Sequence, residues 1–254
     1  MSLRGKVLIG VIGLIAPAAC SRTETSAPPV AATAPPTTAP MPSGTGTVHI
    51  LGHVRFHGSA PSDVERPSKM AFPECSRFGP ADSSLKLGPD GGVADAFVWV
   101  TAGLPGCAYQ APTTPVVLDQ EGCEFRPRVF GVQVGQPVEI RNSDPFLHNT
   151  HAFAGGFNVP LPTKGAKVTR TFAKEEVPAV IGCDVHGWMR AYAGVVSSPF
   201  YAVTDANGGF EIAGLPAGHY TLGVWHERLG RQEADINLAG GEIGVVEIEM
   251  KVKK

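Results

Sequence analysis

The sequence predicts an all-β protein. Apolar residues recur in short alternating runs, and clusters of Gly, Pro, Asn and Asp separate these runs, which is the pattern of β-strands joined by turns. No apolar run of helical period continues beyond a turn or two. The 254 residues suffice for one or two domains, so we expect two sandwich-sized groups of strands.

Residues 1–20 have the composition of an export signal. A basic start precedes the apolar run 7–16, which is too short to span a bilayer, and small residues lead up to Cys20. Residues 21–44 are rich in Ala, Pro and Thr and predict a disordered tether. We therefore expect a periplasmic or other cell-envelope location.

Cys20 is a candidate lipidation site. The run Pro17-Ala18-Ala19-Cys20 resembles a bacterial lipobox, although Pro17 stands where a Leu is usual. The resemblance implies an outer membrane lipoprotein, attached to the membrane by a lipid anchor at Cys20. Cleavage after the small residues, which would leave Cys20 as a stray thiol, is the alternative.

Charge and motif content narrow the function classes. The 21 Lys and Arg and the 23 Asp and Glu give a net charge of −2, and no basic stripe is visible, so we expect no nucleic-acid partner. No Ser/His/Asp set, phosphate-binding loop or pair of acids stands out. We therefore expect that the chain is not an enzyme.

The first strands of the folded part are expected within residues 45–111. Alternation over 47–56 and the apolar run 93–100 each predict a strand. Residues 61–91, between them, contain Pro, Ser and Gly and predict a long irregular loop.

A second group of strands is expected within residues 112–198. The strands are predicted at 116–118, 129–134, 137–141, 167–172, 177–181 and 191–196. Gly135-Gln136 marks a tight turn between the second and third of them.

Residues 199–254 begin with a hairpin whose turn is Asn207-Gly208. The run 204–220 resembles the carboxypeptidase regulatory-like (transthyretin-like) β-sandwich, with its T-D-x-x-G-x-F-x-I-x-x-L-P-x-G-x-Y pattern. The resemblance implies an Ig-like sandwich with a structural or interaction role. Because the segment supplies only four or five strands, we hypothesise that 45–105 completes it and that 112–198 is an insertion. A plain tandem of two sandwiches is the rival.

The clearest functional signal is a set of metal-ligand side chains. Cys183, His186 and Met189 lie within seven residues, and His148 lies upstream. One thiolate, two imidazoles and one thioether are the ligand set of a blue-copper centre, with Met as the weak axial ligand. A zinc site would favour more Cys or His and would not use Met189.

The stretch 115–197 resembles the cupredoxins, and the Cys-x2-His-x2-Met spacing resembles that of amicyanin. Asn149 matches the Asn that in this family forms hydrogen bonds near the thiolate, outside the ligand set itself. The resemblance implies a Greek-key sandwich with a type 1 copper at His148, Cys183, His186 and Met189. It also implies one-electron transfer with a redox protein partner such as a cytochrome or a periplasmic dehydrogenase.

Several alternatives stay open. His151 is a second candidate for the upstream ligand, but it points to the opposite face of a strand from His148, and we therefore expect it at the surface or behind the ligands. A degenerate cupredoxin without metal is a further alternative, as are a non-redox envelope binding or scaffold module and a copper trafficking protein.

The sequence also predicts one disulfide bond and the exposure of two residues near the C-terminus. An oxidising compartment allows a disulfide among Cys75, Cys107 and Cys123. We favour Cys75–Cys123, with Cys107–Cys123 as the alternative. His226 and Glu227 are expected at the surface.

Overall fold

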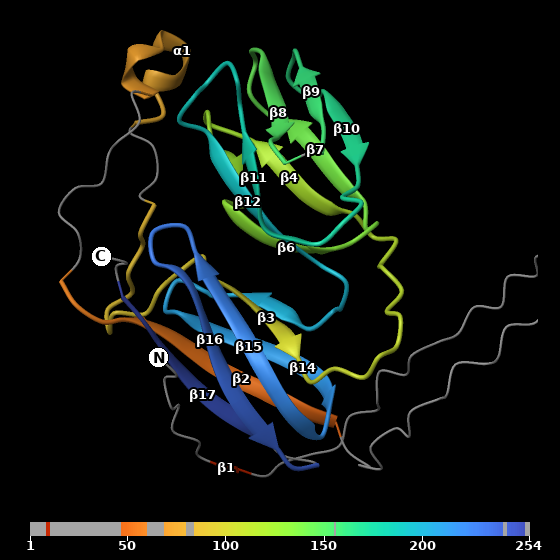
Figure 1. Cartoon of the computed structure of the whole chain (residues 1–254). Helices are drawn as coiled ribbons and strands as arrows, with labels where there is room; N and C mark the ends of the chain where they lie inside the picture. The colour runs from red at the N-terminus through yellow and green to blue at the C-terminus, as the bar shows by residue number, and fades with distance from the viewer. Residues whose placement is uncertain are drawn as a thin grey trace, which may run out of the picture.

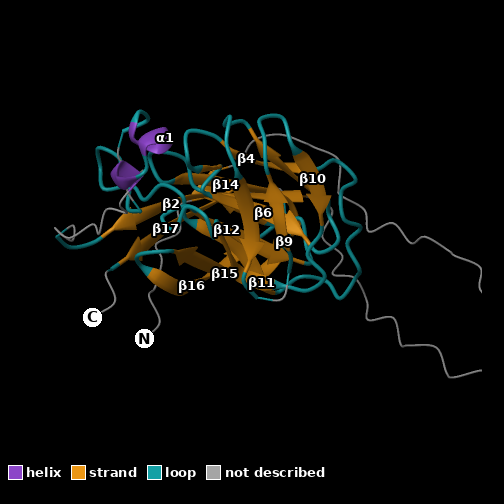
Figure 2. Cartoon of the chain, turned by 90° about the horizontal axis from the view of Figure 1, so that it is seen from above, coloured by secondary structure: helices purple, strands orange, loops and turns teal. Residues whose placement is uncertain are grey.

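The computed structural model describes residues 9–10, 47–59, 69–79, 84–154, 156–240 and 243–251. Strands dominate this part of the chain, which confirms the all-β prediction (Figures 1 and 2). The expected tether and Cys20 lie outside the described residues, as does the expected signal apart from the short strand β1 (Ile9–Gly10). No helix among the described residues is long and apolar enough to cross a membrane.

One pair of sheets forms the half of the molecule shown at the top of Figure 1. We call it the upper sandwich. Its first sheet has the order β10-β7-β4-β5 and its second the order β6-β12-β11-β8-β9. The bounds are β4 (Val116–Gln120), β5 (Phe125–Arg126), β6 (Val129–Gln133), β7 (Val138–Asn142), β8 (His148–Ala152), β9 (Asn158–Leu161), β10 (Lys167–Arg170), β11 (Glu176–Gly182) and β12 (Arg190–Val196).

The upper sandwich encloses one apolar core. Leu118 and Ile140 of the first sheet are fully buried and pack in one cluster with Val132 and Ile181 of the second. This alternation of buried and exposed positions along each strand is what the period of two in the sequence requires. The same cluster extends to Cys183, so the candidate ligand loop lies at one end of this core.

The other half, the lower sandwich, combines strands from both ends of the described chain. Its sheets have the orders β1-β17-β2-β14 and β13-β3-β15-β16. The bounds are β2 (Thr47–Phe56), β3 (Phe97–Ala102), β13 (Tyr201–Val203), β14 (Gly209–Pro216), β15 (Gly218–His226), β16 (Gly230–Leu238) and β17 (Ile243–Met250). Strand β2 pairs with β14 and, in parallel, with β17, while β3 pairs with β13 and β15. Strands that precede and follow the upper sandwich in sequence therefore share both lower sheets.

Aromatic rings fill the junction between the two sandwiches. A Cβ added at Gly131 would lie 2.2 Å from the Tyr201 ring, and one added at Gly194 would lie 2.2 Å from the Phe97 ring. These glycines face each other in the parallel pair β6–β12. Only the absence of side chains lets the two rings approach this sheet so closely, so the glycines fix how closely the sandwiches approach.

A partly buried ionic network also joins the sandwiches. Arg128 forms a paired hydrogen bond with Glu227, and the Tyr192 hydroxyl donates to Glu227 Oε2 at 3.2 Å. Burial, followed by the charge of Glu227, raises the pKa of Tyr192 to about 12. His226 is also buried, and this burial lowers its pKa to about 4. The expectation that His226 and Glu227 lie at the surface is therefore wrong, because both face this junction.

The stretch between β2 and β3 is not an irregular loop throughout. It contains the 3-10 turn η1 (Lys69–Ala71) and the short helix α1 (Pro73–Ser76), with Pro73 at the helix start, where its missing N–H costs nothing. Although it follows a lower-sandwich strand, α1 lies beside the upper sandwich (Figure 1).

Candidate metal centre

The candidate ligands come from two places in one sheet. His148 is the first residue of β8, and Cys183, His186 and Met189 lie in the loop between β11 and β12. Strand β11 pairs with both β8 and β12, so the start of β8 and the loop lie at the same end of the sheet. The fold thus brings together two histidines that are 38 positions apart in the sequence.

Three of the four candidates form a tight buried cluster. The Nδ1 atoms of His148 and His186 are 2.9 Å apart, and Nδ1 of His186 is 3.7 Å from Sγ of Cys183. All three side chains are almost completely buried. One thiol and two imidazole nitrogens therefore face a common point, and Cys183 is the free cysteine of the described chain.

Met189 belongs to the same buried core cluster as Cys183. Its backbone N–H donates to the His186 carbonyl at 2.9 Å, which closes the ligand loop as a tight turn. His151 is half-exposed and bonds to Asp184 at 3.0 Å, outside the three-residue cluster. The sheet thus separates His151 from His148, as the alternation of a strand predicts.

Asn149 connects strand β8, which carries His148, to the loop that carries Cys183. Its Oδ1 accepts hydrogen bonds from Cys183 Sγ at 3.3 Å and from the Asp184 backbone N–H at 2.7 Å. Its Nδ2 donates to Asp184 Oδ2 and to Asn158 Oδ1, both at 2.8 Å. Asn149 therefore fixes the start of the ligand loop against β8.

The environment of Cys183 favours the thiolate. Burial by itself raises the pKa of the thiol, but hydrogen bonds with His148 and His186 and with the backbone of Asn149 outweigh this effect and lower it to about 6. A thiolate is the form of cysteine that binds metal ions. The site is thus electrostatically prepared for a cation.

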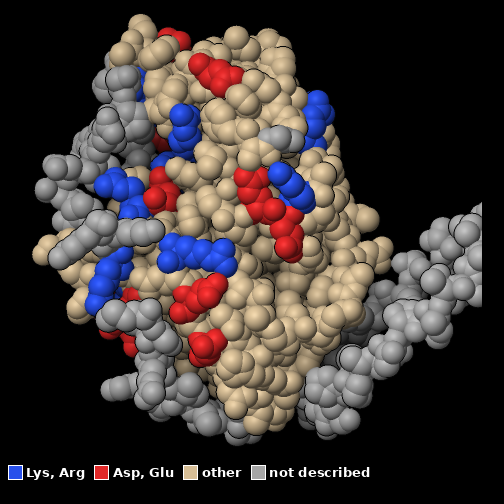
Figure 3. Space-filling view, in the orientation of Figure 1, with Lys and Arg blue, Asp and Glu red and all other residues tan. Residues whose placement is uncertain are grey.

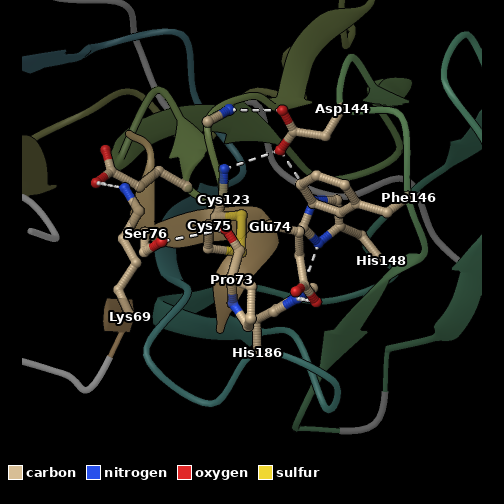
Figure 4. Close-up of a disulfide and its surroundings, with 12 residues drawn as sticks. Lys69, Pro73, Glu74, Cys75, Ser76, Cys123, Asp144, Phe146, His148 and His186 are labelled. Carbon is tan, nitrogen blue, oxygen red and sulfur yellow. Dashed lines mark hydrogen bonds and ion pairs between the residues drawn. A yellow bond between two sulfur atoms is a disulfide. The ribbon is translucent and has the colours of Figure 1, made fainter. Parts of the chain in front are cut away.

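Asp144 orients His148, a role that was not expected from the sequence. Its Oδ2 lies 3.0 Å from Nε2 of His148 and accepts the Cys123 N–H at 2.8 Å, while Oδ1 accepts the Gly122 N–H at 2.9 Å (Figure 4). Burial raises the pKa of Asp144, but the bonds from His148, Cys123 and Gly122 hold it below its usual value. As a carboxylate it accepts the Nε2 proton of His148, which leaves Nδ1 of that ring available for a metal ion.

The signal that could have identified Asp144 is its position four residues before a candidate histidine ligand. An acid at that spacing can turn back onto the ring across a short loop, here 143–147. The same carboxylate raises the pKa of His148, against the lowering effect of burial.

Aromatic rings and a disulfide surround the cluster. The rings of Phe146, Phe72 and Trp188 lie 6.1, 5.5 and 5.1 Å from the His186 ring, measured between centroids. The Cys75–Cys123 bond has an S–S distance of 2.02 Å, which confirms the pairing favoured from the sequence. Cys75 lies in α1, so the disulfide attaches the 69–79 segment beside His186.

The donor set fits a copper ion. A soft thiolate, two imidazoles and a nearby thioether suit copper better than hard cations, which prefer oxygen ligands. Two buried imidazole nitrogens at 2.9 Å require a shared proton or a cation between them. The types of donor atom and the close contact of the two imidazoles both agree with the copper prediction.

Comparisons with known proteins give cupredoxins as structural neighbours. An oxidised mutant of amicyanin is 22% identical over 39% of this chain and 97% of that chain, with a TM-score of 0.30. A purple cupredoxin from Nitrosopumilus maritimus is 21% identical over 32% of this chain and 98% of that chain, with a TM-score of 0.28.

A copper-containing nitrite reductase from Thermus scotoductus SA-01 is 25% identical over 37% of this chain, with a TM-score of 0.30, and the match spans only 24% of that longer chain. No family model and no curated protein matches the sequence. At these TM-scores the neighbours do not identify the ligands, which depend on the geometry above.

Proposed function

We propose that the chain binds one copper ion through His148, Cys183, His186 and Met189 and transfers single electrons in the cell envelope. The observation that carries this proposal is the buried cluster of one thiol and two imidazole nitrogens, with Met189 in the same loop. Copper bound there would supply the one-electron redox couple. The protein would hold the ligands in place in both oxidation states, and we propose no catalysed reaction.

The rigidity of the site supports electron transfer. Asn149 ties the ligand loop to β8, Asp144 fixes the His148 ring, and the β11–β12 pairing holds both ends of the loop. A site that cannot rearrange needs little reorganisation when its charge changes. This stiffness favours electron transfer over the trafficking alternative, in which a metal ion must enter and leave readily.

The surface beside the site supports a protein partner. Leu147 and Val185 immediately precede the two histidines and are 45% and 40% exposed. Exposed apolar side chains next to a redox centre favour brief contact with another protein. Charges of both signs are mixed over the face of the molecule shown in Figure 3. We propose a redox protein as the partner, such as a cytochrome or a periplasmic dehydrogenase, and membrane attachment through Cys20.

The test is the visible spectrum of the copper-loaded full chain. A type 1 centre gives an intense thiolate-to-copper absorption band, and Cys183→Ser should abolish it while the fold remains. Asp119→Asn, in the same sandwich but outside the cluster, is the matched control and should keep the band. Copper bound in stoichiometric amount without this band would refute the type 1 assignment.

A further inference from the structure

The 69–79 segment closes the outer side of His186. The Phe72 ring lies 5.5 Å from the His186 ring and 4.8 Å from the Trp188 ring. Glu74 Oε1 lies 4.0 Å from Nε2 of His186, the ring atom that faces away from the cluster (Figure 4). With this segment in place, His186 is only 1% exposed.

Two attachments hold this segment against the upper sandwich. The Cys75–Cys123 disulfide joins positions 48 residues apart in the sequence. Lys69 Nζ forms a buried ion pair with Glu124 Oε1 at 3.0 Å. Both attachments end on the 121–124 loop, whose Cys123 and Gly122 N–H groups are held by Asp144, the residue that orients His148.

The outer nitrogen of His186, Nε2, has no hydrogen-bond partner among the described residues. Nε2 is buried and unpaired, which is costly for a polar atom. When Nδ1 binds a metal ion, the ring proton must sit on Nε2, where an acceptor stabilises it. The Glu74 carboxylate is the group within reach, and a small rotation would close the 4.0 Å gap.

We propose that residues 69–79 are a disulfide-locked lid, which buries His186 under Phe72 and presents Glu74 to its Nε2, and that reduction of Cys75–Cys123 opens the centre. The inference rests on the proposed function only for the identity of the ion. Opening of the lid exposes the candidate ligand His186, and the frequency of opening therefore sets how fast a metal ion can enter or leave the site. The lid is a second, redox-controlled feature of the site, separate from the electron-transfer chemistry itself.

The opening step is an ordinary thiol–disulfide exchange. A dithiol reductant gives two electrons and two protons, so that Cys75 and Cys123 become thiols and the reductant becomes a disulfide. Without the covalent link, the lid depends on the Lys69–Glu124 pair and on the Phe72 contacts. Local opening then becomes more frequent, because the disulfide no longer holds the ends of a long loop together.

The test uses the metal-free full chain and needs no copper. Diethyl pyrocarbonate modifies accessible imidazoles, and the tryptic peptide 175–190 contains His186 as its one histidine. The exposed His219 and the buried His226 share the tryptic peptide 191–228; fragment masses within it distinguish them, and they serve as internal references. We expect the double variant Cys75→Ser/Cys123→Ser to raise the modification rate of His186 at least about tenfold, with both references unchanged.

Reduction supplies the matched comparison. A phosphine reductant should raise the His186 rate of the natural chain to that of the double variant, and should not change the double variant. If alkylation and peptide mapping show that Cys75 and Cys123 are reduced and the His186 rate does not change, the lid proposal is wrong. The same conclusion follows if the reductant accelerates the double variant equally, because its target would then be another bond.

A second variant covers the case in which the double variant unfolds, which modification of His226 would reveal. Phe72→Ala keeps the disulfide but removes the ring that covers His186, and it should raise the rate several-fold. An unchanged rate in Phe72→Ala would overturn the lid. No metal is used, so a His186 that becomes reactive on reduction supports the lid even if the copper-loaded chain lacks the type 1 band. If the band is present and His186 does not become reactive, the copper proposal stands and the lid proposal is wrong.

Discussion

Replacing Asp144 by Asn should damage the site although Asp144 is not one of the candidate ligands. Three donors converge on its two oxygens: the Gly122 and Cys123 N–H groups and Nε2–H of His148, at 2.9, 2.8 and 3.0 Å. Asp144 is 3% exposed, so water cannot replace a lost bond. An asparagine offers one acceptor oxygen and one NH2 group in the same space.

Both orientations of that amide are unfavourable. With its NH2 towards Gly122, a buried N–H faces another donor. With its NH2 towards His148, the ring must accept at Nε2 and carry its proton on Nδ1, which faces the cluster. One unpaired buried donor and the loss of charge on the remaining bonds together cost about 3 kcal/mol of unfolding free energy. A displaced proton on Nδ1 lowers metal affinity by about 10- to 100-fold.

Two measurements check this prediction. Urea unfolding of the metal-free protein gives the free-energy difference, and competition with a chelator gives the copper affinity. Asp119→Asn is the matched control, because its carboxylate is half-buried and accepts from Ser143 Oγ at 2.8 Å without touching the cluster. We expect it to cost less than about 1 kcal/mol. An Asp144→Asn chain with the stability and affinity of this control would refute the reasoning.

Four further predictions concern the junction, the ligands and the assembly. The pKa of His226 is about 4 in the folded chain and about 6.5 in the unfolded chain, so its contribution of about 3 kcal/mol to the unfolding free energy is present above pH 6.5 and is lost as the pH falls towards 4. Unfolding free energies of the natural chain and of His226→Gln, measured across this pH range, should differ by this pH-dependent contribution. Gly194→Ala should cost about 1–3 kcal/mol in chemical unfolding, because its Cβ would overlap the Phe97 ring, whereas Gly165→Ala, where nothing lies within 4 Å, tests strain alone. Met189→Leu should keep the visible band of the copper protein but change its reduction potential, as voltammetry will show. Expressing residues 112–198 alone tests the insertion hypothesis, which is refuted if this piece cannot fold without 45–105.

The ligand loop was predictable because its information is local. Cys183, His186 and Met189 lie within seven residues, and the chemistry of a thiolate, an imidazole and a thioether restricts the metal without knowledge of the fold. That His148, and not His151, lies with Cys183 and His186 was predictable for a similar reason, since the period of a strand puts the two rings on opposite faces.

Charged residues at the junction were not predictable. Glu227 follows a strand and has the composition of a solvated hairpin end, but it is buried by its bond to Arg128, 99 positions earlier. The neighbouring His226 is also buried, at 1% exposed. Their burial depends on how two sandwiches dock, which no local pattern encodes.

By itself the sequence determined the all-β class, the strand periods and the candidate metal-binding residue types, because each follows from short-range spacing. The tertiary structure decided which distant residues surround those ligands: Asp144 behind His148, and the 69–79 segment with Phe72 and Glu74 over His186. The physical reason is that the environment of a buried ligand is made by long-range contacts. A disulfide across 48 residues and a carboxylate shared by two backbone amides and one ring exist only once the chain has folded.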